Sequence, residues 1–349
     1  TAVAYADLSP DGGDPEAAWE QATAHIRRLE ELIHGPLPEG VLPLAWQDSA
    51  SVDIGSTSSN RSRGDFEEAV RSAREHIAAG DVFQLVISQR LEAHLTGDPF
   101  DLYRSLRMVN PSPYMAYFNF GDWILIGSSP EVMVKAVPRQ EGMILATVRP
   151  IAGTRPRGED EQQDLALERE LLNDPKERAE HVMLVDLGRN DLGRVCRPGT
   201  VKVEELMVIE RYSHVMHIVS QVEGLLQPAK DVWDLLMACF PAGTVSGAPK
   251  IRAMQLIHAL EPDARGPYSG VYGAVDLSGA LNTAITIRTM VLRPDPAGGW
   301  RVQVQAGAGI VADSRPEAEY QETLNKARGM LKALACLQPE HTPAGGSSR

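Results

Sequence analysis

The sequence lacks the features that mark several special classes of protein. Its three cysteines, Cys196, Cys239 and Cys336, lie far apart and form no Cys-x-x-Cys pair, which disfavours a disulfide framework and a zinc site. No apolar run reaches the roughly 18 residues of a membrane-spanning helix, and the first residues show no signal peptide. We therefore expect reduced thiols and a cytoplasmic location. Because the chain starts without Met and in an expected strand, we also expect it to be a fragment.

Basic residues are in deficit as well. The 349 residues include 34 Lys and Arg against 47 Asp and Glu, and the formal net charge is −13. This balance disfavours nucleic acid and anionic membranes as partners. An acidic protein that binds an anionic substrate must neutralise it locally, with a metal ion, arginine, lysine or backbone N–H groups. The hydrophobic share of 43% is ordinary, and the length allows one large core or two fused subdomains.

Hydrophobic periodicity and capping residues divide the chain into helices and strands. We expect helices at about 15–34, 65–79, 99–109, 160–192, 231–240, 249–260 and 316–337. We expect strands at about 2–8, 81–95, 114–120, 123–129, 132–137, 143–148, 201–226, 268–277, 280–292 and 300–311. Strands follow strands, so the pattern indicates an α+β fold with large antiparallel sheets rather than repeated βαβ units.

Two pairs of glutamates stand out in stretches that are expected to be helical. Glu177 and Glu180 form one pair, and Glu319 and Glu322 form the other. The spacing i, i+3 places both carboxylates of a pair on one helix face. Two such faces across a cleft would offer hard oxygen ligands suited to Mg²⁺. A solvated acidic face is the ordinary alternative for either pair alone.

Three glycine-rich segments invite comparison with nucleotide sites. The run Gly307-x-Gly309-x-x-Ala312 lacks the βαβ context of a dinucleotide fold, and PAGTVSGAPK lacks the spacing of a P-loop before its lysine. Thr244, Ser246 and Gly247 in the latter remain either anion contacts at a helix start or a plain helix cap. In PIAGTRPRG, Gly153 allows close approach of the backbone and Thr154 supplies a hydroxyl.

Nine motifs, in this order, resemble the chorismate-utilising enzymes: DVFQLVISQR, NPSPYMAYF, SSPEVMV, RPIAGTRPRG, ERAEHVMLVDLGRNDLGRV, FPAGTVSGAPK, GPYSGVYGAV, ITIRT and AGAGIVADSRPEAEYQET. Within that family they are most similar to the large subunits (component I) of anthranilate synthases. The resemblance implies two interlocked α+β subdomains, with two large antiparallel sheets facing each other and helices outside. It predicts a chorismate-binding catalytic domain at 64–338, preceded by the remnant of an N-terminal segment and a mobile linker at 1–63 and followed by a disordered tail at 339–349.

The resemblance also implies a site for chorismate and Mg²⁺ between the subdomains. Glu177, Glu180, Glu319 and Glu322 resemble the magnesium cluster, directly or through water. The expected substrate contacts are Ala152, Gly153, Thr244, Tyr268, Arg288, Gly307 and Gly309, of which Tyr268 and Arg288 resemble the clamp on the enolpyruvyl carboxylate. Arginine suits that carboxylate because its guanidinium binds two oxygens at once. The expected catalytic residues are Glu131, His214, Gln84, Thr154 and Lys326.

Four of these positions imply the chemistry. Glu131 resembles the general acid that protonates the departing C4 hydroxyl, and burial beside an anionic substrate would raise its pKa for that task. His214 resembles the residue that assists loss of the enolpyruvyl group, although a core histidine is the ordinary alternative. Water-using relatives carry a lysine base where this chain has Gln84, and other relatives carry a ring-attacking lysine where it has Ala152. The implied reaction is addition of ammonia at C2, followed by elimination of pyruvate to give anthranilate.

The resemblance implies partners and leaves alternatives open. No glutaminase nucleophile is placed on the three cysteines, so we expect ammonia from a separate glutamine amidotransferase subunit in a hetero-oligomer. The segment Asn110, Pro111, Ser112, Tyr114 and Met115 resembles one wall of a tryptophan inhibitor site whose other wall is not recognised in this chain. The open alternatives are aminodeoxyisochorismate synthase, aminodeoxychorismate synthase and a catalytically silent scaffold of the same fold.

Overall fold

The computed structural model describes residues 3–6, 14–36, 57–212 and 215–337, which belong to two compact units, 1–45 and 46–349. In the first unit, helix α1 (Pro15–His34) begins at Asp14, whose side chain accepts from the backbone N–H of Glu16, and it has the predicted bounds. Residues 3–6 form no strand, and the remainder of the strand predicted at 2–8 lies outside the described residues. The predicted boundary at 63/64 stays a prediction.

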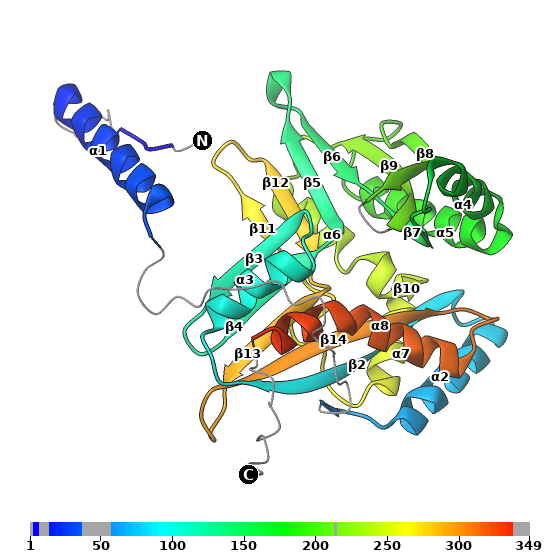
Figure 1. Ribbon diagram of the computed structural model, residues 1–349. Helices are drawn as coiled ribbons and strands as arrows, with labels where there is room; N and C mark the ends of the chain where they lie inside the picture. The colour runs from blue at the N-terminus through cyan, green and yellow to red at the C-terminus, as the bar shows by residue number, and fades with distance from the viewer. Residues whose placement is uncertain (1–2, 7–13, 37–56, 213–214, 338–349) are drawn as a thin grey trace, which may run out of the picture. The chain divides into compact units, whose positions relative to one another are not determined.

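The second unit contains two antiparallel sheets of seven strands each (Figure 1). The first runs in the order β1-β2-β14-β13-β4-β3 with β10 also paired to β2, and the second in the order β11-β12-β5-β6-β9-β7 with β8 also paired to β9. The first sheet comprises β1 (Ser58–Ser59), β2 (Gln84–Leu95), β3 (Tyr114–Asn119), β4 (Ile124–Ser129), β10 (Gly247–Ala248), β13 (Thr289–Pro294) and β14 (Trp300–Ile310). The second comprises β5 (Val132–Pro138), β6 (Ile144–Val148), β7 (Ile151–Pro156), β8 (Lys202–Arg211), β9 (Val215–Leu225), β11 (Val271–Val275) and β12 (Leu281–Ile285).

Helices cover each sheet. The helices on the first sheet are α2 (Arg63–Ala78), α3 (Pro99–Val109), α7 (Lys250–Leu260) and α8 (Pro316–Ala335). Those on the second sheet are α4 (Glu161–Asn173), α5 (Pro175–Gly193) and α6 (Val232–Cys239), and the short turns are η2 (Gln140–Gly142) and η3 (Gly243–Val245). The antiparallel sheets with helices outside confirm the predicted α+β fold. None of the helices that the structure describes combines the length and apolar character needed to cross a bilayer.

The helix predicted at 160–192 is in fact two helices, α4 and α5. Asp174 separates them because Pro175 has no N–H to continue the hydrogen-bond ladder. The Asp174 carboxylate instead caps α5 by accepting from the backbone N–H groups of Lys176 and Glu177, at 2.9 and 3.3 Å. This break matters for the site, because it starts α5 at Pro175, two residues before its first paired glutamate, Glu177.

The alternation of side chains along β2 decides which residues lie in the core and which face the second sheet. Leu85 and Ile87 are fully buried against α2 and α7. Because neighbouring side chains on a strand point to opposite faces, Gln84 lies on the face of the sheet opposite to α2 and α7. The sheets meet where the Tyr272 hydroxyl of β11 donates to the backbone carbonyl of Tyr114 on β3, at 2.8 Å. The Tyr114 hydroxyl returns a 3.0 Å bond to Asn282 of β12.

Candidate functional site

The glycines of β14 lie at places where no larger side chain fits. A Cβ on Gly307 would lie 2.6 Å from the Tyr268 hydroxyl, and one on Gly309 would lie 2.7 Å from Nε2 of Gln84. Real Cβ atoms essentially never approach so closely, so Tyr268 and Gln84 pack directly against the backbone at these two positions. The structure therefore places Tyr268 against Gly307 and Gln84 against Gly309, and a role for these residues in binding substrate stays a prediction. The printed sequence shows the glycines but not their neighbours.

Lys326 lies against the same strand. Its ammonium donates to the carbonyl of Gly307 at 2.9 Å and pairs with Glu322 at 2.7 Å, one turn earlier on α8. Its charge also lowers the pKa of Glu131. The side chain thus carries positive charge to the glycine strand, to one predicted metal ligand and towards the predicted acid.

Tyr268 and Arg288 share this interior. Burial raises the pKa of Tyr268 to about 12, with Arg265 and Arg288 opposing the rise. Burial lowers the pKa of Arg288, and the charges of Tyr268 and Glu322 oppose that change. The Arg288 backbone has a φ of 50°, which few side chains other than glycine adopt. A buried cation on a strained backbone is typical of a group that is held for a ligand.

The four glutamates come from two helices and act on one another. Burial raises the pKa of Glu180, and the carboxylates of Glu177 and Glu322 raise it further. Burial also raises the pKa of Glu319, with Glu322 adding to the effect and a hydrogen bond from Ser314 opposing it. The charge of Glu322 on α8 thus acts on Glu180 on α5, which places the two pairs near each other, while a shared metal site stays a prediction.

The donor set fits a hard divalent cation. Carboxylate oxygens are the ligands that Mg²⁺ prefers, and a cation would relieve the repulsion that raises the pKa of Glu180. Within the described ranges, no three His, Cys, Asp or Glu side chains lie close enough to hold a metal as they stand. Glu177 is instead 3.6 Å from the Arg155 guanidinium, and Glu322 is paired with Lys326. Any cation would therefore have to draw these two carboxylates away from basic partners.

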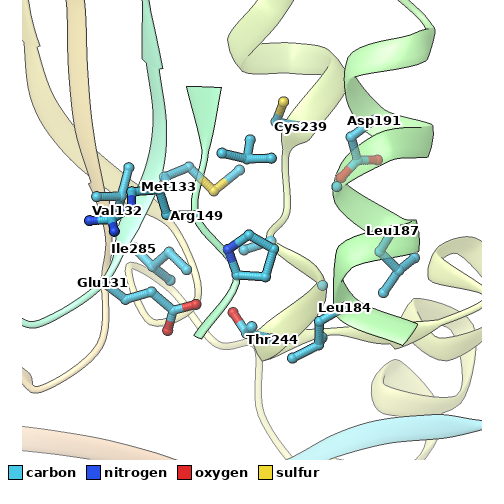
Figure 2. Close-up of a pocket in the computed structure, with 15 residues that line it drawn as sticks. Glu131, Val132, Met133, Arg149, Leu184, Leu187, Asp191, Cys239, Thr244 and Ile285 are labelled. Atoms are coloured by element: carbon cyan, nitrogen blue, oxygen red, sulfur yellow. The ribbon is translucent and has the colours of Figure 1, made fainter. Parts of the chain in front are cut away.

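Glu131 and Thr244 lie next to each other at one end of a pocket (Figure 2). Burial raises the pKa of Glu131 to about 7, while the Thr244 hydroxyl and Lys326 oppose the rise. Glu131 follows β4 at the start of β5, where its carbonyl accepts from the N–H of Ile285 at 3.0 Å. A carboxyl with a pKa near neutrality can carry a proton at the pH of the cell, which is what a general acid requires.

Strand β7 presents Ala152, Gly153 and Thr154 beside the glutamates. Gly153 has a φ of 68°, and a Cβ there would lie 3.2 Å from a carboxylate oxygen of Glu177. The strand bulges between Ala152 and Thr154, so that Ala152 pairs with Ile218. The Ala152 position offers only a methyl group and no nucleophile.

The histidine that the structure places here is His217, which the sequence analysis overlooked. Its Nδ1 lies 3.0 Å from both the carbonyl of Gly153 and the hydroxyl of Thr154. Burial lowers its pKa, and the charge of Arg288 acts in the same direction. The predicted His214 lies outside the described residues. Alternation along β9 offered a signal, because Met216 and Ile218 are buried and His217 must then point to the other face.

Arg155 is a second residue that the sequence analysis missed. Its guanidinium binds Glu170 at 2.8 Å and Asp174 at 3.1 Å, and it lies 3.6 Å from Glu177. It thereby connects β7 to α4 and to the start of α5. The arginine positions the helix that carries the first glutamate pair.

The segment predicted as an inhibitor wall connects α3 to β3. Asn110 caps α3, its carbonyl accepts from the Ser128 hydroxyl, and Tyr114 begins β3. Tyr114 contacts Tyr272 and Asn282 of the second sheet. Pro111 and Ser112 lie between these elements, and Met115 packs against the core of the first sheet. A role in binding tryptophan stays a prediction.

Residues 10–332 match the family model described as chorismate binding enzyme. The chain is 60% identical over 338 residues to "Anthranilate synthase component 1" of Synechocystis, covering 96% of this chain and 66% of that protein. It is 53% identical over 321 residues to the protein of the same name from Streptomyces coelicolor, covering 91% and 61%. The chain thus spans less than two thirds of the length of these curated relatives. A crystal structure of anthranilate synthase component I from Streptococcus pneumoniae matches with a TM-score of 0.75 and 42% identity, covering 93% of this chain and 68% of that one.

Proposed function

The chain belongs to the family of chorismate-binding enzymes, and on that basis we propose that it converts chorismate and ammonia into anthranilate and pyruvate. Relatives at 53% and 60% identity that are named anthranilate synthase component 1 support this proposal. Because the chain spans less than two thirds of their length, the activity is proposed for the protein of which these residues are part.

The observation that carries the choice of nucleophile is the contact of Gln84. Its amide Nε2 donates to Glu180 at 2.8 Å, and its Oε1 is buried with no hydrogen-bond partner among the described residues. An amide cannot deprotonate water, whereas ammonia needs no base before it attacks. The buried Oε1 is also a free acceptor for an N–H donor. Ammonia therefore suits this position better than water.

The remaining residues supply binding. Arg288 and Tyr268 offer a guanidinium and a hydroxyl to the enolpyruvyl carboxylate, and the backbone of Gly307 and Gly309 is assigned to the ring carboxylate. The glutamates of α5 and α8 would hold Mg²⁺, which when bound supplies positive charge to that ring carboxylate. Lys326 holds the Gly307 carbonyl and keeps the strand in place.

Two residues carry out the two proton transfers of the proposed reaction. Glu131, with its pKa of about 7, donates a proton to the C4 hydroxyl as ammonia adds at C2, so water leaves. His217, whose pKa is lowered by burial, is neutral near pH 7 and accepts a proton in the second step. That step releases pyruvate and makes the ring aromatic. The Thr154 hydroxyl contacts His217 and orients its imidazole.

The words "component 1" in the relatives' names support a separate partner component. We propose that this partner is a glutamine amidotransferase subunit that supplies ammonia in the cytoplasm. The test is direct. Purified protein with chorismate, Mg²⁺ and ammonium should give anthranilate fluorescence and equal amounts of pyruvate. Consumption of chorismate without pyruvate would point instead to a synthase that stops after amination.

A further inference from the structure

A small cavity lies beside Glu131, and the proposed mechanism does not use it (Figure 2). Its volume is about 50 Å³, and helix α5, turn η3 and strands β5 and β6 form its walls. Glu131 and Thr244 lie at one end, and Asp191 and Cys239 lie towards the other. None of the residues assigned to the carboxylates of chorismate or to the metal lines it. The cavity therefore adjoins Glu131 and is separate from the proposed carboxylate and metal sites.

Polar atoms short of partners mark this cavity as a place for water. The Nε of Arg149 is buried and has no hydrogen-bond partner among the described residues, and the buried Thr244 hydroxyl has none there beyond the Glu131 carboxyl whose pKa it lowers. Both residues line the cavity. Buried polar atoms in folded proteins are almost always paired with protein or ordered water, and roughly 10–15 Å³ is enough for one water molecule. Space and polar partners for a few water molecules are thus present together.

Resting on the proposed function, we propose that this cavity is a water site through which Glu131 regains its proton after each turnover. The acid loses one proton per cycle and must regain it from solvent. The cavity lies against the Glu131 carboxyl and the Thr244 hydroxyl, so that water within it can deliver this proton. The Asp191 carboxylate, paired with Lys250 at 2.8 Å, lines the opposite wall.

Nitrogen supplies the electron pair of the new C2–N bond. Both ring double bonds shift, from C1=C2 to C1=C6 and from C5=C6 to C4=C5, and the C4–O bond breaks with its pair on oxygen. Glu131 gives its proton to that oxygen, so water leaves and a carboxylate remains. The C2 ammonium loses one proton to solvent, and a cavity water returns one proton to Glu131 from solvent. No oxidant or reductant is involved.

Ala242→Val tests the water site by filling it. Ala242 lines the cavity and packs against the core cluster of the second sheet. We expect kcat to fall by about 10-fold, less than the loss of the acid itself, with a larger solvent deuterium isotope effect and unchanged KM for chorismate and ammonium. Ala238→Val is the matched control, because it adds the same volume to the same cluster without lining the cavity. It should leave the isotope effect unchanged.

Two results would overturn the water site. One is an unchanged kcat in Ala242→Val. The other is a raised KM for ammonium with kcat restored at saturation, which would make the cavity the nucleophile's route. A high-resolution crystal structure of the unaltered protein gives a readout that needs no turnover. We expect ordered water within hydrogen-bond distance of the Thr244 hydroxyl, and a dry cavity would refute the inference. Failure to form anthranilate from ammonium would defeat the proposed function alone, since the crystallographic result would stand independently.

Discussion

The side-chain amide of Gln84 donates a 2.8 Å hydrogen bond to the carboxylate of Glu180, joining β2 of the first sheet to α5 of the second. The bond accounts for two properties of the site at once. It partly offsets the rise that burial causes in the pKa of Glu180, and it places a non-basic side chain where water-using relatives of the family carry lysine. The choice of nucleophile and the predicted metal cluster are thus coupled through one contact.

We predict that Gln84→Lys lowers anthranilate formation and gives detectable isochorismate. The new ammonium would lie beside Glu180 and, when deprotonated, could activate water at C2. Product analysis by chromatography after incubation with chorismate and Mg²⁺ measures both compounds. Gln84→Met is the control, because it removes the amide without adding a base and should form no isochorismate. If the lysine variant formed no isochorismate, residue 84 would not decide whether water or ammonia attacks chorismate.

We predict that activity requires a divalent cation. Exhaustive chelation should abolish anthranilate formation, and Mg²⁺ should restore it. Glu180→Gln should lower activity by about 10²-fold or more at saturating chorismate, since it removes a ligand charge from the cluster. Glu317→Gln is the control, because Glu317 lies exposed in the first turn of α8 outside the two pairs. Full activity in the chelated protein would refute the metal assignment.

We predict a pH effect on stability from Glu131. Its pKa rises from the ordinary 4.5 to about 7 on folding, so between these values the folded state keeps a proton that the unfolded state has lost. The free energy of unfolding contributed by this group is therefore fully present below pH 4.5 and falls as pH rises to about 7. Glu131→Gln stays neutral at every pH and should lack this decline. Urea unfolding at several pH values measures the difference, and parallel curves would contradict a buried acid.

We predict that Glu131 and His217 act in different steps. Glu131→Gln should block consumption of chorismate, because the C4 hydroxyl then leaves without a proton. His217→Ala should still consume chorismate but release pyruvate about 10²–10⁴-fold more slowly, as expected for a lost proton acceptor. Mass spectrometry should then detect an aminated, non-aromatic intermediate. His214→Ala is the comparison, and an intermediate in that variant alone would return the role to the histidine first predicted.

We predict that Gly307→Ala destabilises the protein by about 1–3 kcal/mol, the usual range for overpacking. The added Cβ would lie 2.6 Å from the Tyr268 hydroxyl and would displace that side chain. The KM for chorismate should rise as well, since Tyr268 contributes to the substrate clamp. Gly193→Ala is the control, because no atom lies within 4 Å of a Cβ there. Thermal unfolding and initial rates of both variants test the prediction, which equal stability would contradict.

Local sequence signals were sufficient for most elements. The bounds of α1 follow from Asp14 and Pro15, a cap followed by a proline at the first helical position. The same pairing at Asp174 and Pro175 escaped notice within a long periodic stretch, so one helix was expected where there are two. The hydrophobic period continues through Asp174. Periodicity therefore does not reveal that one helix ends there and a second helix begins, capped by the same residue.

The sequence by itself determined what depends on neighbours along the chain: helix caps, strand alternation, the i, i+3 spacing of each glutamate pair, and the motifs that resemble the family. Tertiary structure alone decided which of these features meet. Whether Gln84 reaches Glu180, which lies 96 positions further on, depends on the pairing of strands and on the packing of α5 over the second sheet. The position of His217 was decided in the same way, because register sets it beside Gly153 and Thr154. Such contacts depend on how whole sheets pack, which no local pattern encodes.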